Sequence, residues 1–252
     1  MEKHKKNHST LILLNVIAGL LLSTWLMPAT RHFWDIIDAK VFYFLNGWVA
    51  TNHVAQIFWA ITNYRPFDII PFLFLLSTCC IADFFIPKAQ LKSACILLFF
   101  TMILLLILRI IMYKLFGVHR ASASLSLAPA YLLKALVPYI QSKDASSHSF
   151  PGDHAAVIFV WIGFMWIFAK NNYYRLLAII IGSFFILPRL VAGAHWFSDD
   201  FVGGLFVAII AIAWTCFTPL TNLIIEKTLP ILNFCLNKLV PRAILTRTFE
   251  RG

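Results

Sequence analysis

The stretch LKSACILLFFTMILLLILRIIMY, residues 91–113, is an apolar run interrupted by only two basic side chains. A helix of about 20 apolar residues crosses the hydrocarbon core of a bilayer, so this stretch predicts a membrane-spanning helix. Similar runs recur along the chain. We expect about six spans in all, over residues 10–27, 67–86, 91–113, 154–168, 176–194 and 201–225.

The overall composition agrees with a membrane protein. Of the 252 residues, 60% are hydrophobic and 13% are charged, whereas a soluble domain has roughly half apolar and a quarter charged residues. We therefore expect an all-α integral membrane protein with one membrane domain over 1–252 and its chemical motifs within 114–200. The aromatic-rich loops 28–66 and 114–153 are expected to form interfacial helices on the outer side.

The distribution of basic residues predicts the orientation. Lysines at the N-terminus, in two alternate loops and in a basic tail over 227–252 place both termini on the cytoplasmic side. The first span follows three lysines, so a cleaved signal peptide is the alternative. No convincing cleavage site follows it, and we expect an uncleaved anchor. We attribute the formal net charge of +10 to basic residues that contact anionic lipid headgroups, and we expect no nucleic-acid partner.

The five cysteines lie in the predicted spans and the tail, without metal-ligand spacing. We therefore expect no disulfide, no metal and no cofactor. The oligomeric state stays open.

Three polar clusters meet on the predicted outer face of the membrane. They comprise Lys114 and Arg120; Gly152, Asp153 and His154; and Arg189, His195, Asp199 and Asp200. Their convergence from distant parts of the sequence predicts one site.

The histidines carry the chemistry of this predicted site. His195 and Asp199 are four residues apart, so on a helical turn the carboxylate can orient one ring nitrogen and leave the other as a nucleophile. The alternative is a loop histidine beside a capping aspartate. His154 is a candidate general acid, although a capping turn with Asp153 as the cap would also explain that segment.

The cations Lys114, Arg120 and Arg189 are candidate ligands of a phosphate, because guanidinium groups match its oxygens. The alternative is that they extend from helix ends to the interface, which we take as the role of Arg109. Together with the histidines, these cations predict phosphoryl transfer. Metal catalysis is disfavoured because no carboxylate-rich ligand set accompanies them.

Two motifs resemble signatures of the type 2 phosphatidic acid phosphatase (PAP2) superfamily. Arg189-x5-His195-x3-Asp199 is similar to its third signature, and the Pro-Gly-Asp-His segment at 151–154 resembles its second. The first signature is less well matched, since Lys114 is one residue too close to Arg120 and an alanine replaces the usual proline. Flanking segments such as TNYRPFD (62–68) and PRLVAGAHWFSDD (188–200) resemble the lipid A 1-diphosphate synthase branch.

This resemblance implies a two-step phosphotransferase at the periplasmic face of a bacterial inner membrane. His195 would attack the terminal phosphate of undecaprenyl diphosphate and form a phosphohistidine, with Asp199 orienting it. His154 would protonate the departing undecaprenyl phosphate, and the 1-phosphate of Kdo2-lipid A would then accept the phosphate. A lipid phosphatase that uses water is the alternative, and a non-enzymatic lipid carrier is a distant one.

The resemblance also raises two questions about the second motif. Gly152 stands where the superfamily has a phosphate-binding serine, so only its backbone N–H would face the anion. Asp153 adds a carboxylate that would repel phosphate unless a cation pairs with it. Lys143 and His148 are the candidates for that cation.

Overall fold

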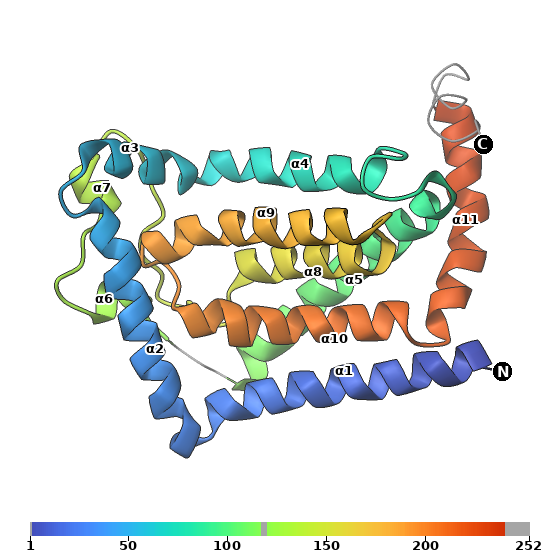
Figure 1. The fold of residues 1–252 in the computed structure, drawn as a ribbon, viewed down its shortest axis with the longest axis horizontal. Helices are drawn as coiled ribbons and strands as arrows, with labels where there is room; N and C mark the ends of the chain where they lie inside the picture. Colours follow the sequence, from blue (N-terminus) through green and yellow to red (C-terminus); the bar gives the residue numbers. More distant parts are fainter. Residues whose placement is uncertain (1, 117–119, 240–252) are drawn as a thin grey trace.

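The computed structural model describes residues 2–116 and 120–239 (Figure 1). Those residues form helices and no strand, which confirms the all-α prediction. By length and composition, four of the described helices can cross a membrane. They are α1 (Glu2–Leu26), α5 (Lys88–Phe116), α9 (Asn172–Val191) and the continuous unit of the π-helix η3 (Asp199–Gly204) and α10 (Leu205–Cys216).

The other two predicted spans are shorter helices. α8 (Asp153–Phe168) has 16 residues and α4 (Ile69–Cys80) has 12. α4 ends before the predicted limit of residue 86 because the chain turns at Asp83, whose φ is 58°. Phe85 and Ile86 then fold back into the core, where they are buried. Hydropathy alone does not distinguish such buried turn residues from the end of a span.

The sixth predicted span, 201–225, is wrong at its end. α10 stops at Cys216, and α11 (Leu220–Leu239) begins directly after Pro219. Because the residue before a proline disfavours helical backbone, one apolar run becomes two helices. The predicted tail 227–252 therefore begins inside α11, which lies across one end of the bundle in Figure 1. Its residues 240–252 lie outside the described part of the chain.

The two ends of the described chain lie at the same end of the bundle (Figure 1). The opposite end is covered by α2 (Pro28–Asn46) and α3 (His53–Thr62), joined by the 3-10 helix η1 (Gly47–Val49). Proline at the first position suits the start of α2. In the described part of the second long loop, residues 120–152, the helices are the one-turn α6 (Ala123–Ser126) and α7 (Leu133–Leu136), which are shorter than expected.

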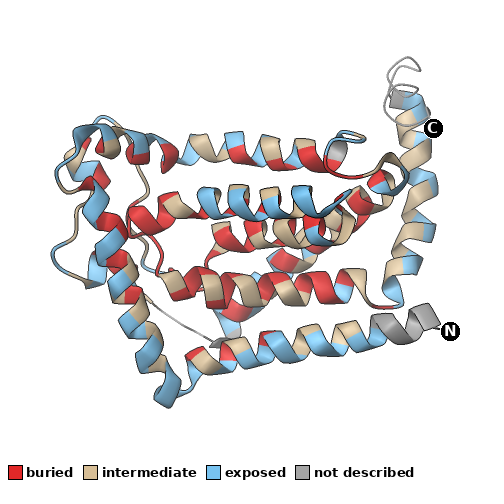
Figure 2. Ribbon diagram, in the orientation of Figure 1, coloured by how far each residue is buried: buried red, intermediate tan, exposed pale blue. Residues whose placement is uncertain are grey.

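The core of the bundle lies around α8 and α10. Trp161, Phe164 and Met165 of α8 are almost fully buried, whereas α1, α4 and α11 expose much of their surface (Figure 2). Many outward-facing side chains on these helices are apolar, such as Leu20 on α1 and Phe72 on α4. Helices with apolar outer faces and internally paired backbones are what a bilayer accepts.

Candidate active site

A cavity of about 430 Å³ lies between α5, α8, α9 and the 3-10 helix η2 (Arg65–Asp68). The site is toward the end of the bundle that carries α2 and α3 (Figure 1). Its lining comprises Arg65, Asp68, Arg109, Lys143, Asp153, His154, Val157 and Arg189. Because four of these side chains are basic and two are acidic, the cavity favours an anion.

His195 is buried in the turn between α9 and η3, next to Gly193, whose φ of 70° makes the turn possible. Its Nδ1 lies 2.8 Å from the carbonyl oxygen of Ser149, which can only accept a hydrogen bond. The proton therefore lies on Nδ1, and Nε2 carries the lone pair. Among the described residues, Nε2 has no hydrogen-bond partner.

Burial lowers the pKa of His195, and the carboxylates of Asp199 and Asp153 only partly oppose that shift. The ring is therefore neutral under conditions in which an exposed histidine would begin to bind a proton. A neutral, unpartnered Nε2 is in the state that a nucleophile requires.

The spacing predicted that Asp199 orients His195, but no direct hydrogen bond joins the two side chains. Its Oδ2 lies 4.0 Å from His195 Nδ1 and instead accepts from the backbone N–H of Trp196 at 2.8 Å. Its Oδ1 accepts from Arg120. With both oxygens occupied, Asp199 acts on the ring only through its charge, and the Ser149 carbonyl holds the ring.

Arg120 is bound by protein carboxylates and is not among the residues that line the cavity. Its guanidinium lies 2.6 Å from Asp38 and 2.8 Å from Asp199, both of which are fully buried. It also donates to the hydroxyl of Ser198 and lies over the Trp196 ring. Burial raises the pKa of Asp38, and Arg120 opposes this by stabilising the ionised carboxylate. Arg120 thus ties α2 to the turn that carries Asp199.

Arg189 lines the cavity but is also held by protein groups. It donates to the side-chain oxygen of Asn63 at 2.6 Å and to Asp68 at 2.7 Å. Both partners come from the TNYRPFD segment, which therefore positions this arginine. The hydrogen bonds to Asn63 and Asp68 thus hold the Arg189 guanidinium in a fixed position at the cavity wall.

His154 also lines the cavity, at the start of α8. Its Nε2 lies 3.0 Å from the carbonyl oxygen of Phe185, so Nε2 carries a proton. The other ring nitrogen, Nδ1, is then the position that can gain or release a proton during a reaction.

Asp153 is paired with Arg109, and not by an ion pair with Lys143 or His148. Its Oδ2 lies 2.8 Å from Arg109 Nη2, and its Oδ1 lies 3.6 Å from His195 Nε2. The prediction that Arg109 serves only as an interfacial anchor is therefore wrong. A usable signal existed, because an arginine within an apolar span is costly unless it has a partner.

Gly152 does not offer its backbone N–H to the cavity, since that group donates to the carbonyl oxygen of Asp199 at 2.8 Å. A Cβ at this position would lie 2.0 Å from Asp200 Oδ1 and 3.1 Å from the carbonyl oxygen of Asp199. Glycine is thus required by the close approach of α8 to η3. Asp200 itself is buried, with no hydrogen-bond partner for its carboxylate among the described residues.

The two candidate lysines differ in position. Lys114 is exposed near the end of α5 and is not among the residues that line the cavity. Lys143 is half-buried in the cavity wall, where burial lowers the pKa of its ammonium group and the Asp153 carboxylate opposes this. Of the two, Lys143 can reach a ligand in the cavity.

Sequence reasoning assigned several residues that build the site no part in it. These are Asp38, Asn63, Arg65, Asp68, Arg109 and Ser149. Within the described residues, no group of three or more His, Cys, Asp or Glu side chains is arranged to hold a metal ion.

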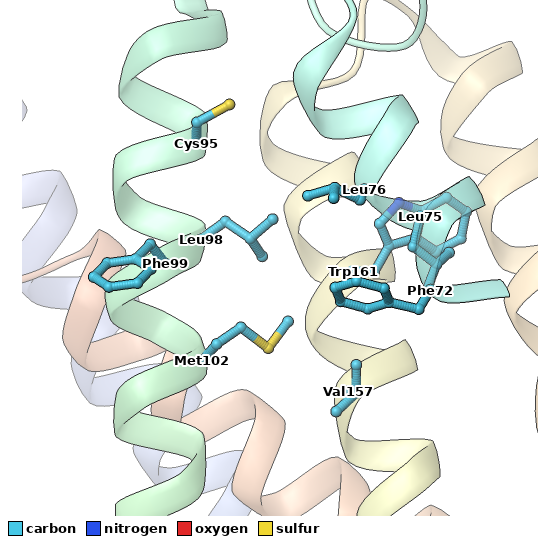
Figure 3. A pocket seen from close by; sticks show the side chains of 9 residues that line it. All are labelled: Phe72, Leu75, Leu76, Cys95, Leu98, Phe99, Met102, Val157 and Trp161. Atoms are coloured by element: carbon cyan, nitrogen blue, oxygen red, sulfur yellow. The ribbon is translucent and has the colours of Figure 1, made fainter. Parts of the chain in front are cut away.

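An apolar groove lies beside the cavity, between α4, α5 and α8 (Figure 3). Its volume is about 270 Å³, and its lining includes Phe72, Leu98, Met102 and Trp161. Val157 lines both the groove and the cavity, so the two spaces adjoin. A charged cavity next to an apolar groove suits an amphipathic ligand.

Comparisons with known proteins agree with this arrangement. Residues 99–222 match the model of the PAP2 superfamily. The chain is 33% identical to the lipid A 1-diphosphate synthase of Escherichia coli (strain K12) over 230 residues, which cover 89% of this chain and 95% of that protein. No solved structure matches.

Proposed function

Because this chain belongs to the PAP2 superfamily, we propose that it transfers the terminal phosphate of undecaprenyl diphosphate to the 1-phosphate of lipid A. The family and the relative support an enzyme that acts on phosphate groups in a membrane. The specific donor and acceptor are our proposal, supported by the identity to a lipid A 1-diphosphate synthase over nearly the whole chain.

The observation that carries the proposal is the state of His195. In the first step, its Nε2 forms a bond to the terminal phosphorus as the bond from that phosphorus to the bridging oxygen breaks. Undecaprenyl phosphate leaves with the bridging oxygen. His154 donates a proton to it from Nδ1 when both ring nitrogens are protonated, because the neutral ring carries its one proton on Nε2, toward the Phe185 carbonyl. The buried charge of Asp199 stabilises the cationic ring, and the phosphohistidine holds the phosphoryl group.

In the second step, an oxygen of the lipid A 1-phosphate attacks the phosphorus, the N–P bond breaks and a 1-diphosphate is formed. This acceptor is already an anion, so it needs no base. If water attacks instead, the enzyme is a lipid phosphatase, in which His154 would take up the water proton. Both reactions use the same protein groups.

The cations that line the cavity would offset the charge on the transferred group. Arg189 does so from a fixed position, while Lys143 and Arg65 extend the positive wall. Arg120 contributes through Asp199, because its own donors are occupied by carboxylates. Lys114, exposed near the end of α5, stays a prediction as a phosphate ligand.

The apolar groove of Figure 3 would receive part of a lipid tail while the phosphate lies in the adjoining cavity. The termini lie at one end of the bundle and the cavity lies toward the other. Together with the basic residues near the termini, this supports cytoplasmic ends and a periplasmic site in the inner membrane.

A labelled donor tests the proposal. Purified protein is incubated with undecaprenyl diphosphate that carries the label in its terminal phosphate, with and without lipid A. We expect the label to move to lipid A. Release of free phosphate regardless of acceptor would replace the synthase with a phosphatase. No turnover together with no acid-labile phosphoprotein would reject both.

The pH profile gives a second test. A histidine whose pKa is lowered loses its proton at lower pH, so His195 stays neutral below the ordinary value of about 6.5. The acid limb of kcat/KM, which reports the free enzyme, is therefore expected below pH ~6.5. Initial rates of label transfer between pH ~4.5 and ~8 would measure it. An acid limb at or above the ordinary value would contradict the buried, neutral ring.

A further inference from the structure

The carboxylate of Asp153 lies between the proposed nucleophile and a cation of the cavity. Its Oδ1 is 3.6 Å from His195 Nε2, and its Oδ2 is 2.8 Å from Arg109 Nη2. No described group makes a hydrogen bond to that nitrogen. The space in front of Nε2 is thus held by an anionic group of the protein itself.

A substrate phosphate needs the same space. For attack, the phosphorus must lie about 3–3.5 Å from Nε2 along its lone pair. The Asp153 oxygen stands at nearly that separation. A phosphoryl group and an ionised carboxylate cannot share this position, because both are negatively charged and each excludes the other sterically.

Arg109 differs from Arg120 and Arg189 in how it is held. Arg120 and Arg189 are almost buried and have several protein partners each. The side chain of Arg109 is 51% exposed, and that of Asp153 is 32% exposed. Since the pair is open to the cavity, a phosphate can replace the carboxylate as the partner of Arg109 without leaving the arginine unpaired.

We propose that Asp153 is a stand-in for the substrate phosphate: an arriving phosphoryl group displaces its carboxylate from His195 Nε2 and takes over Arg109. This inference rests on the proposed function, because it assumes that His195 is the nucleophile. Arg109 then binds the phosphoryl group, the part that Lys114 was expected to play. Asp153 disfavours the binding of small free anions, because they lack a lipid tail whose contacts would offset the free-energy cost of displacing the carboxylate.

Binding of orthovanadate to the full-length protein in detergent tests this by titration calorimetry. Asp153→Asn keeps the oxygen that accepts from the His154 N–H but removes the charge. We expect this variant to bind orthovanadate about tenfold more tightly than the parent, and Arg109→Gln to bind it about tenfold more weakly. The matched control is Asp83→Asn, at a left-handed turn position that asparagine tolerates, which should leave the affinity unchanged.

The outcomes separate this inference from the proposed function. Unchanged or weaker binding by Asp153→Asn, in protein whose thermal unfolding matches the parent, would overturn the stand-in role. So would a lack of binding in both proteins. Label transfer in the parent would support the proposed function in either case. If the label never moves but Asp153→Asn binds more tightly, the anion site stands and the proposed reaction fails.

In turnover with the lipid donor, the same variant should lower KM. A role for Asp153 as a proton donor or as a necessary phosphate ligand would instead lower kcat, which would contradict the inference.

Discussion

His195→Ala is expected to lower phosphate transfer by a factor on the order of 10⁴ to 10⁶, as removal of a nucleophile does in other enzymes that form covalent intermediates. The reason is specific to this ring. Its Nε2 carries the lone pair, because Nδ1 donates to the Ser149 carbonyl, and it lies 3.6 Å from Asp153, which lines the cavity. Label transfer from the lipid donor measures the loss.

His32→Ala is the matched control, since His32 is exposed on α2 and distant in sequence from every motif. It should retain parental activity. The phosphoprotein provides a second readout: the parent should form an acid-labile, alkali-stable adduct with labelled donor, and His195→Ala should not. Retained transfer or a retained adduct in a folded His195→Ala protein would mean that another residue is the nucleophile.

Asp38→Ala is expected to destabilise the protein by about 3–5 kcal/mol, the range found when one partner of a buried ion pair is removed. Asp38 is fully buried on α2, where it accepts from Arg120 at 2.6 Å and from both the backbone N–H and the hydroxyl of Ser198. Without it, Ser198 loses two bonds and Arg120 loses one of its carboxylates. The free energy of unfolding in detergent measures the effect.

Asp35→Ala is a matched control on the same helix. Asp35 lies 3.6 Å from the same Arg120, but its side chain is 50% exposed. Solvent weakens such a contact, so the expected loss is about 0–1 kcal/mol. Equal losses for the two variants would contradict a buried network centred on Arg120.

A double-mutant cycle between Asp38 and Arg120 separates the two roles considered for this arginine. If Arg120 holds α2 to the Asp199 turn, the Arg120→Ala and Asp38→Ala effects on stability will be strongly non-additive. If Arg120 instead binds substrate phosphate, Arg120→Ala will raise KM and leave stability nearly unchanged.

Several features of this protein follow from the sequence because they are local. A run of apolar residues forms a helix wherever lipid is the solvent, so the membrane class and most spans follow from hydropathy. The Arg189–His195–Asp199 motif can likewise be recognised from its spacing, because its three residues lie on one short segment that connects α9 to η3. The predicted ends of two spans were wrong because the apolar residues there belong to a turn, as at Phe85, or to a new helix, as after Pro219.

Only the tertiary structure decided which charges meet. Arg109 and Asp153 lie on different helices, and Asp38 and Arg120 lie on different segments of the chain. No sequence spacing relates the members of either pair. Sequence reasoning could assign Arg120 to phosphate and Arg109 to the interface, whereas the structure buries the first between two carboxylates and opens the second to the cavity. Gly152 also became intelligible only through its neighbours, since the atoms that a Cβ would meet belong to Asp199 and Asp200.

The sequence by itself thus determined that this is a helical membrane protein with motifs of the PAP2 superfamily. The tertiary structure decided which nitrogen of His195 is free, which cations are already paired and why glycine precedes Asp153. The physical reason is that helix formation and motif spacing depend on near neighbours along the chain, whereas the pairing of buried charges and the closest approach of two backbones depend on how distant segments pack.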